Sequence, residues 1–271
     1  MTGVRERLLR VLRPVLGGVQ LNHLVRLLPV ADLVRDAAPR TVLDVGSGSR
    51  GVARWLPHGL TVVALDHSFD DYGAASRPAG DALAVLGDVA RLPFVDDAFD
   101  VVIAVDLLEH LPSGLRATAV HHLVRVARHR VVIAGPAGQA AYDADTRLAG
   151  VLHGRPGGVP PWLQEHVDNG FPEIDELREL LAPHGDVSVH GNLNVGAHER
   201  LVLTELAPTA FLPTRLRAAA LGALYRRSPA GRSRVRAQLA ALGAGDREPT
   251  YRAVLVLDLE PRASTRRATA Q

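Results

Sequence analysis

The stretch Thr41-Val-Leu-Asp-Val-Gly-Ser-Gly-Ser-Arg-Gly51 decides the fold of this 271-residue chain. Apart from Asp44, its first five residues are apolar or β-branched, which is typical of a buried parallel strand. Gly46 and Gly48 allow a sharp turn, and they let the backbone approach a ligand that a Cβ atom would obstruct. A helix is expected to start at Val52, and the N–H groups at its start favour an electron-rich or anionic group. The stretch therefore predicts a nucleotide-binding unit of strand, turn and helix.

Two kinds of nucleotide site are compatible with these glycines. Gly46-Ser-Gly-Ser-Arg-Gly51 fits the G-x-G-x-x-G pattern of dinucleotide sites, so an NAD-dependent oxidoreductase is one alternative. Asp44 argues against it, because a carboxylate at the strand end before the first glycine would repel a pyrophosphate. An acid at this place suits a ligand with a positive amino group. S-adenosylmethionine carries an ammonium and a sulfonium and has no phosphate.

Composition narrows the class of protein. Hydrophobic residues make up 47% of the chain, enough for the core of one large domain with elaborations. The absence of cysteine excludes disulfides and thiolate metal sites. All 31 basic residues are arginines and the formal net charge is +2, which gives no indication of nucleic-acid binding. Arg10 and Arg13 interrupt the apolar run near the N-terminus, and no stretch reaches the ~18 apolar residues of a membrane span. We expect a cytoplasmic protein.

Strands and helices alternate along the first half of the chain. Residues 1–39 are expected to form a helical extension on the core, with helices over 4–16, 21–28 and 30–37. After it, the pattern predicts a helix from Val52 to about Leu56, a helix over 114–128, and strands over 41–45, 61–65, 82–86, 99–105 and 131–134. This alternation predicts βαβ units and a parallel sheet.

The rest of the chain completes one domain over residues 40–260 with two insertions. The first insertion, at about 137–171, is rich in Gly and Pro and is expected to be irregular. The second, at about 209–248, is expected to be mainly helical. The other elements expected here are a helix over 172–181 and strands over 186–190 and 251–259. Residues 261–271 form a polar tail that is expected to be disordered.

Three acids, Asp44, Asp66 and Asp88, stand at the ends of the first three expected strands, each 22 residues after the one before. In an open parallel sheet, ligands bind beyond the carboxyl ends of the strands, so these carboxylates should converge on one crevice. Asp66 is placed to accept hydrogen bonds from both ribose hydroxyls, and Asp88 from an adenine amino group. Asp44 can orient the glycine loop or reach the ammonium through water.

Two stretches resemble the class I S-adenosylmethionine-dependent methyltransferases. One is Val42-Leu-Asp-Val-Gly-Ser-Gly-Ser with Asp66. The more specific one, which resembles the small-molecule branch of the family, is Gly87-Asp-Val-Ala-Arg-Leu-Pro-Phe-Val-Asp-Asp-Ala-Phe-Asp-Val-Val-Ile-Ala-Val-Asp-Leu-Leu-Glu-His-Leu-Pro112. The resemblance covers about residues 40–136. It implies an α/β fold with a Rossmann-like, seven-stranded, mostly parallel sheet, helices on both faces and an antiparallel last strand.

The resemblance also implies S-adenosylmethionine as the cofactor. Gly46 and Gly48 would then face its methionine part, and the loop at Val105-Asp106 would approach its amino-acid end. The candidate cofactor-binding residues are Asp44, Gly46, Ser47, Gly48, Asp66, His67, Asp88, Val89, Val105 and Asp106. One departure concerns Arg50, which stands where the family usually has a third glycine, with Gly51 one place later. The loop is therefore expected to be one residue wider, and a degenerate methyltransferase fold that only binds is a second alternative.

His110 and His166 are the candidate catalytic residues. Methyl transfer is an in-line displacement that mainly requires positioning, but an oxygen nucleophile often also needs a base. His110 follows the fourth expected strand, and His166 lies in the first insertion, which tends to line the acceptor pocket in this family. Glu165, His166 and Asp168 could in principle bind a metal, but without a second cluster no metal site is predicted. We expect methylation of a small or carrier-linked acceptor, most simply at oxygen.

Two further patterns bear on the acceptor and on partners. From Phe211 to Ala240 the chain has seven arginines and no acid, which indicates either a solvated face or contact with an anionic acceptor or membrane surface. Nucleic acid is not expected, because there is no aromatic interleaving that could stack bases. The stretch Trp162–Pro172, with Pro249-Thr-Tyr-Arg252, resembles methyltransferases found with glycan- or envelope-modifying enzymes, which suggests a lipid-linked or phosphorylated sugar acceptor. Nothing in the sequence indicates an oligomeric state.

Overall fold

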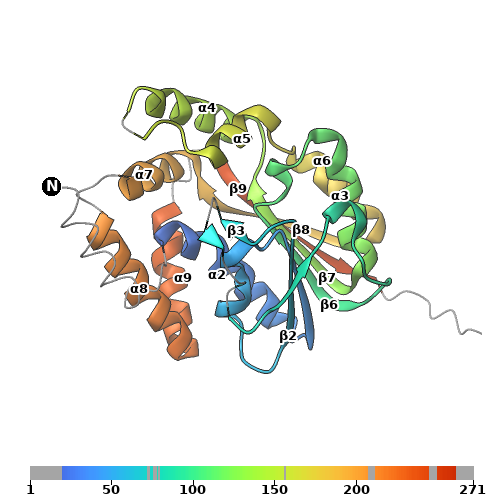
Figure 1. Ribbon diagram of the computed structural model, residues 1–271. Helices are drawn as coiled ribbons and strands as arrows, with labels where there is room; N and C mark the ends of the chain where they lie inside the picture. The colour runs from blue at the N-terminus through green and yellow to red at the C-terminus, as the bar shows by residue number, and fades with distance from the viewer. Residues whose placement is uncertain are drawn as a thin grey trace, which may run out of the picture.

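A seven-stranded sheet forms the centre of the computed structural model, which describes residues 20–71, 74–75, 78, 80–155, 157–206, 211–243 and 249–260 (Figure 1). The order across the sheet is β5-β2-β1-β6-β7-β9-β8. Its strands are β1 (Thr41–Val45), β2 (Thr61–Asp66), β5 (Leu83–Leu86), β6 (Phe99–Val105), β7 (Ala127–Pro136), β8 (Gly185–Asn194) and β9 (Thr250–Leu259). Two short strands, β3 (Asp70–Asp71) and β4 (Ala74–Ala75), form a separate ribbon.

The direction of the strands decides which residues share an edge. The pairs from β5 to β7 are all parallel, whereas β9 pairs antiparallel with both β7 and β8. The start of β9 therefore lies beside the carboxyl ends of the other strands, where Arg252 pairs in register with Pro136. The predicted mostly parallel sheet with an antiparallel last strand is confirmed.

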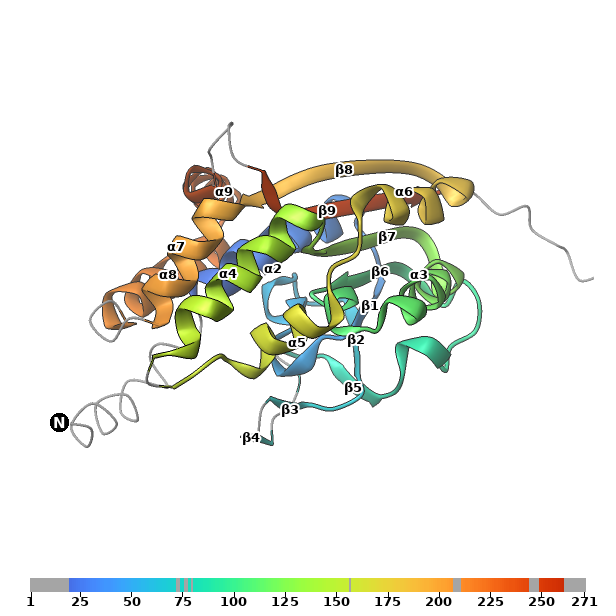
Figure 2. The same cartoon turned by 90° about the horizontal axis from the view of Figure 1, so that it is seen from above.

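Helices cover both faces of the sheet, as Figure 2 shows for α2 and α3. Alternate residues of the buried strands point to opposite faces, so Val42 belongs to one core cluster and Leu43 to the other. The first cluster includes residues of α2, α4, α8 and α9, and the second includes residues of α3 and α6. The helices are α2 (Leu21–Asp36), α3 (Ser113–Val126), α4 (Gln139–His153), α5 (Pro161–Asn169), α6 (Ile174–Leu181), α7 (Val195–Leu206), α8 (Phe211–Arg227) and α9 (Pro229–Gly243).

The N-terminal helices differ from the prediction. Residues 21–36 form one continuous helix, α2, with Pro29 inside it, instead of two separate helices. Most of its apolar residues are buried in the main core, and this packing outweighs the helix-breaking tendency of proline. The helix predicted over 4–16 and the tail at 261–271 lie outside the described residues.

The helix predicted from Val52 to about Leu56 is present as a 3₁₀ helix, η2 (Val52–Trp55). A further short 3₁₀ helix, η1 (Gly48–Arg50), precedes it in the glycine loop. Gly51 separates them with an extended conformation, φ −59° and ψ −176°. The N–H of Val52, which has no partner within η2, donates to the buried Asp44 carboxylate and so fixes the start of this helix.

The two insertions are helical. The prediction that residues 137–171 are irregular is wrong, because they form α4 and α5. Glycine and proline mark the ends of these helices: Gly138 precedes α4, Gly154 follows it, and Pro161 occupies the first turn of α5. The second insertion is helical as predicted, and α8 and α9 pack on α2.

Candidate functional site

The glycine loop lies between β2 and the loop that follows β6. Gly46 and Gly48 have φ values of +71° and +51°, which glycine adopts without strain. The Gly46 N–H donates to the Leu65 carbonyl at 2.8 Å. A Cβ atom at Gly46 would lie 2.8 Å from Leu107 Cδ1, so a side chain is excluded there. The loop is thus packed tightly against Leu107, in the segment that follows β6.

Asp44 holds the other end of this loop. Its buried carboxylate accepts a hydrogen bond from the Val52 N–H at 2.9 Å, and so it orients the loop, one of the two roles expected for it. Burial raises the pKa of Asp44 to about 7, with a further contribution from Asp66 and an opposing one from the Val52 hydrogen bond. A Cβ atom at Gly51 would overlap this carboxylate. Gly51, which stands one place later than the third glycine of the family, therefore leaves room for the Asp44 carboxylate.

Asp66 and Asp88 end neighbouring strands, as the sequence predicts. The Asp66 carboxylate is buried and accepts hydrogen bonds from Gly48 N–H at 2.8 Å and Ser68 N–H at 3.1 Å. The next residue, His67, is exposed, with Nδ1 3.0 Å from Asp66 Oδ1. Asp88 is exposed and caps η3 (Val89–Arg91) through Ala90 N–H at 2.8 Å. The backbone of Ser47 donates to the Leu65 carbonyl, and Val89 and Val105 are buried.

Asp106, which follows β6, is held by two arginines that the sequence analysis did not identify as candidate site residues. Its carboxylate forms ion pairs with Arg26 of α2 and Arg252 of β9. Burial alone would raise the pKa of Asp106, but Arg252 and Arg26 outweigh it and lower the pKa to about 2. The aspartate is therefore a fixed anion that ties α2 and β9 to the carboxyl end of β6.

This edge of the sheet fits S-adenosylmethionine better than a dinucleotide. The Gly48 N–H, which a pyrophosphate would require, already donates to Asp66. Asp44 adds a second buried carboxyl directly beneath the loop. Two acids at the loop oppose a phosphate but suit a ligand with an ammonium, a sulfonium and a ribose.

A second group of polar residues is buried beside this edge, around Asp145 of α4. His166 Nδ1 lies 2.7 Å from one Asp145 oxygen, and His198 Nε2 lies 2.9 Å from the other. The Tyr251 hydroxyl donates to Asp145 at 2.9 Å, and its ring stacks on His198 with centroids 3.4 Å apart. Asp145 is 0% exposed, so four elements, α4, α5, α7 and β9, meet at one carboxylate.

The two predicted histidines lie next to each other, His166 buried within this group and His110 half-buried beside it. His110 belongs to η4 (Leu108–His110), and its ring centroid lies 5.0 Å from that of His166. His110 Nδ1 is 2.8 Å from Glu165 Oε2. Glu109 is 1% exposed and lies against Gly135, where a Cβ atom would be 3.1 Å from its Oε2.

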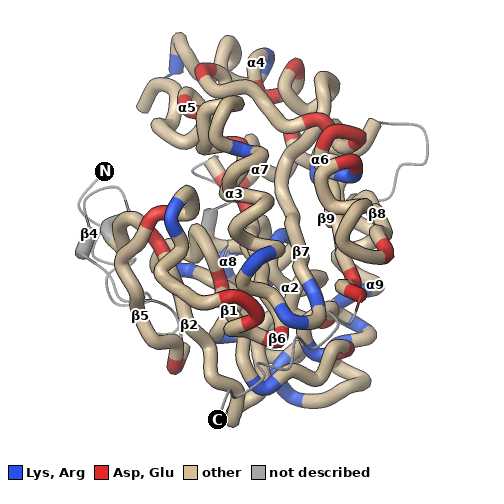
Figure 3. Tube along the Cα trace, turned by 90° about the vertical axis from the view of Figure 1, so that its right-hand side faces the viewer, with Lys and Arg blue, Asp and Glu red and all other residues tan. Residues whose placement is uncertain are grey.

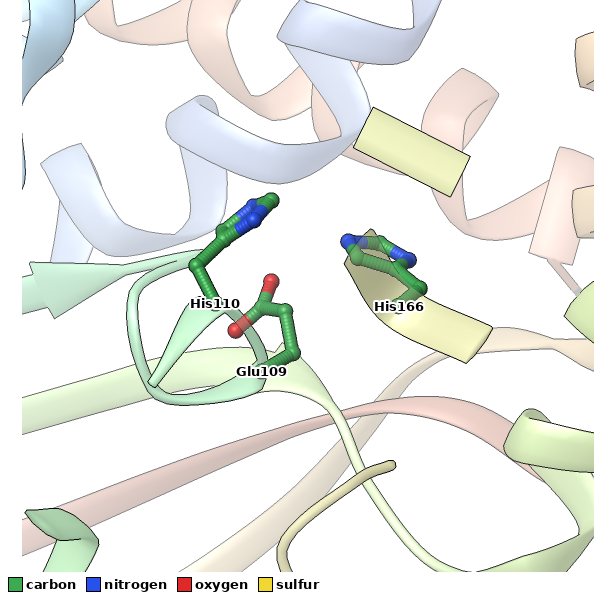
Figure 4. A group of neighbouring side chains, drawn as sticks. All are labelled: Glu109, His110 and His166. Atoms are coloured by element: carbon green, nitrogen blue, oxygen red, sulfur yellow. The ribbon is translucent and has the colours of Figure 1, made fainter. Parts of the chain in front are cut away.

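Glu109 is an unusual carboxyl. Burial raises its pKa to about 7, Asp106 adds to this rise, and His166 opposes it. Its Oε1 atom has no hydrogen-bond partner among the described residues. One ligand-type atom from each of Glu109, His110 and His166 lies within 4.8 Å of the others, and Figure 4 shows the three side chains converging on one gap.

The structure does not bring together the set considered for a metal in the sequence. Glu165 faces His110, and Asp168 accepts from Gln164 at 2.9 Å, away from His166. The residues that the sequence reading missed are Arg26, Asp145, His198, Tyr251 and Arg252. Tyr251 and Arg252 stand in a stretch that was singled out, but Asp145 has no neighbouring motif that could have revealed it.

The arginines of α8 and α9, whose positions along the chain are coloured blue in Figure 3, are all exposed or partly exposed. Arg236 Nε lies 3.3 Å from Asp32, and the Arg226 guanidinium lies 5.5 Å from the Trp55 ring centroid. Arg217, Arg227 and Arg234 are exposed. In the part of the chain that the structure describes, no helix is long and apolar enough to cross a membrane.

The fold and the site together define a class. A sheet in this strand order, with a glycine loop after β1 and acids at the carboxyl ends of β1 and β2 and just beyond β5, is the architecture of class I methyltransferases. Comparisons with known proteins agree, because a family described as "Methyltransferase domain" matches residues 43–134. The chain thus has the class I methyltransferase fold and carries a methyltransferase domain over residues 43–134, and the cofactor that these findings indicate is S-adenosylmethionine.

Two curated relatives are both named demethylmenaquinone methyltransferase. The protein from Thermotoga maritima is 35% identical over 77 residues, 27% of this chain and 33% of that protein. The protein from Renibacterium salmoninarum is 29% identical over 182 residues, 62% of this chain and 75% of that protein. This chain thus spans only a third of the length of the first relative and three quarters of the second.

Solved structures share the fold at low sequence identity. The plantazolicin methyltransferase BamL, solved with a substrate analogue and SAH, has a TM-score of 0.55 at 13% identity, over 87% of this chain and 85% of that chain. A putative methyltransferase from an antibiotic biosynthesis pathway of Anabaena variabilis has a TM-score of 0.51 at 15% identity, over 87% and 99%.

Proposed function

We propose that the chain transfers a methyl group from S-adenosylmethionine to an oxygen atom of a small or carrier-linked acceptor. The observation that carries this proposal is the histidine pair itself, whose member His110 stands three residues after Leu107, the residue that packs on the glycine loop. Leu107 packs against Gly46, and Glu109 and His110 follow directly in η4. Residues at the end of β6 therefore connect the cofactor side with the candidate activating groups.

The cofactor-binding residues are those at the strand ends. Asp66 would hold the ribose, Asp88 with Val89 the adenine, and the glycine loop the methionine part. When bound, S-adenosylmethionine supplies an electrophilic methyl group on a positively charged sulfur. The chain contributes position: Asp44 and Gly51 fix the loop, and Asp106 fixes α2 and β9 at the same edge.

Activation of the acceptor is assigned to His110 and His166. Each has its Nδ1 atom against a carboxylate, Glu165 for His110 and Asp145 for His166. In the neutral tautomer that these contacts favour, Nδ1 carries the proton and Nε2 keeps a free lone pair. Two such nitrogens near one gap suit a hydroxyl acceptor, which has to lose a proton during methylation.

The stretches that resemble glycan- and envelope-modifying methyltransferases contribute to this site. Glu165 and His166 come from one of them, and Tyr251 and Arg252 from the other. This supports a glycan or a lipid-linked, phosphorylated acceptor. The exposed arginines of α8 and α9 suit an anionic membrane surface, and we place the reaction in the cytoplasm. In this proposal the domain spans residues 40–260, and the N-terminal extension contributes Arg26 to the site.

Calorimetric titration tests the cofactor side. Asp66→Ala should weaken binding of S-adenosylmethionine and S-adenosylhomocysteine by ~1–3 kcal/mol, because a buried acceptor is lost. Asp81→Ala, which removes an exposed acid, is the matched control and should bind as the wild type does. Binding of NAD alone would contradict the proposal. Cofactor binding without turnover on any hydroxyl acceptor would favour the degenerate fold that only binds.

A further inference from the structure

The gap between Glu109, His110 and His166 has the composition of a metal site. One nitrogen or oxygen atom from each side chain lies within 4.8 Å of the others. Ligands around one ion, with bonds of about 2.0–2.2 Å, lie roughly 3–4 Å apart. A closure of about 1 Å by side-chain rotation would therefore bring all three onto one ion. Figure 4 shows that Glu109 and His110 approach from η4 and His166 from α5.

The surroundings of the two imidazoles strengthen this assignment. Histidines that bind metals almost always donate their other ring N–H to a carboxylate, carbonyl or water. Both histidines follow this rule, because Glu165 lies 2.8 Å from His110 Nδ1 and Asp145 lies 2.7 Å from His166 Nδ1. Asp145 is itself fixed by His198 and Tyr251. The rings are therefore already oriented with Nε2 available.

Glu109 provides an independent observation. Its side chain is buried, yet its Oε1 atom has no hydrogen-bond partner among the described residues. A buried polar atom without a partner is unfavourable, and an adjacent cation would supply the missing interaction. A purely structural cluster would be expected to satisfy this oxygen.

We propose that Glu109, His110 and His166 bind one divalent transition-metal ion that takes the acceptor hydroxyl as a further ligand. Two imidazoles and one carboxylate suit Zn²⁺, Co²⁺ or Fe²⁺, whereas Ca²⁺ and Mg²⁺ prefer oxygen ligands. This proposal replaces the sequence-based expectation that the chain has no metal site. It rests on the proposed oxygen methylation for the purpose of the ion and refines it, because histidines whose Nε2 atoms bind the ion activate the acceptor through the ion and not as free bases. Ion binding itself can be tested separately.

The ion would change the acidity of the acceptor. Three protein ligands leave at least one coordination position open, as in catalytic zinc sites. The His110 side chain is 29% exposed, so the gap is accessible from solvent. When a hydroxyl binds there, its O–H bond breaks, the proton passes to solvent water, and the ion compensates the charge that remains on oxygen.

Titration with Co²⁺ tests the site without any methyl transfer. The full chain is first treated with a chelator, and the visible d–d absorption is recorded as Co²⁺ is added. One equivalent should bind, and Zn²⁺ should displace it. His166→Gln and Glu109→Gln remove ligands and should weaken binding by more than the roughly 10–100-fold expected for Glu165→Gln, which removes an outer contact. His58→Gln, at a histidine side chain that is 99% exposed, should bind Co²⁺ as the wild type does.

The same samples separate this proposal from the proposed function. Binding of S-adenosylhomocysteine, measured by calorimetry, reports whether each variant is folded. Wild-type protein that binds S-adenosylhomocysteine but shows no stoichiometric Co²⁺ absorption would overturn the metal proposal and leave methyl transfer intact. Equal Co²⁺ binding by a folded ligand variant and the wild type would also overturn it. Co²⁺ bound as expected by a protein that binds no cofactor would support the metal site and contradict the proposed reaction.

Discussion

The glycine loop and the Asp145 cluster lie at the same edge of the sheet but are held in different ways. Asp44, Asp66 and Asp88 bond to backbone N–H groups, and each has a partner eight residues away or fewer. Asp145 bonds only to side chains in the contacts described above, with partners 21, 53 and 106 residues away. The hydrogen bonds of the loop reach no further than the next strand, as in the bond from Gly48 to Asp66 18 residues away, whereas the cluster exists only when distant elements have packed. The difference indicates that the cluster depends on the tertiary fold and the loop depends much less on it.

The largest effect is expected at the cluster. Asp145→Ala leaves His166, His198 and Tyr251 without their common acceptor in a buried site, and we expect a loss of about 3–5 kcal/mol in the free energy of unfolding. Urea denaturation followed by circular dichroism measures this. Asp88→Ala is the matched change in the loop region and should cost only about 1 kcal/mol, because it removes one exposed cap. Equal losses in the two variants would remove the distinction between the regions.

The second effect depends on pH and concerns Asp44. Its folded-state pKa of about 7 lies above the usual 3.8, so between about pH 4 and 7 the folded chain binds a proton that the unfolded chain does not. Stability relative to Asp44→Asn should therefore fall as pH rises through this window, by at most about 1.4 kcal/mol per unit, and become constant above it. Urea denaturation of both proteins between pH 4 and 8 measures the difference. A difference that does not vary with pH would show that Asp44 is ionised in the folded protein throughout.

The smallest effect is expected at Gly51. Gly51→Ala places a Cβ atom on the Asp44 carboxylate, and the overlap should cost about 1–3 kcal/mol of stability and weaken cofactor binding. Gly114→Ala in α3 is the control, since no atom lies within 4 Å of its added Cβ. That control should be neutral or slightly stabilising. Unchanged thermal unfolding and cofactor affinity in Gly51→Ala would mean that the loop adjusts freely.

The same difference explains what the sequence could predict. The glycine spacing and the acids at 44, 66 and 88 are local signals that repeat with the βα unit, so the sheet and the cofactor edge were predictable. The helix at Val52 was predicted within one residue of its end, but the hydrogen bond from its first N–H to Asp44 was not, because that contact depends on where a strand residue points. Residues 137–171 were predicted to be irregular because glycine and proline indicate breaks but do not show whether helices lie between them.

The cluster could be predicted only in part. His110 and His166 were each selected from their own segment, but their proximity depends on how α5 packs beside η4. Glu109 stands next to His110 in a quoted motif, yet its burial without a partner is a tertiary property. Asp145 is one acid in an amphipathic helix, and no pattern distinguishes it from the exposed Asp143 before the chain has folded.

The reversed direction of β9 has a practical consequence for handling the protein. Arg252 lies at the edge with the site, and the strand then runs to Leu259, which pairs with Gly185 at the beginning of β8. The described chain thus ends at Glu260, at the edge where the parallel strands begin, opposite the site (Figure 2). A surface tether attached at Glu260 would leave the site facing free solution, which suits immobilised binding assays with bulky acceptors.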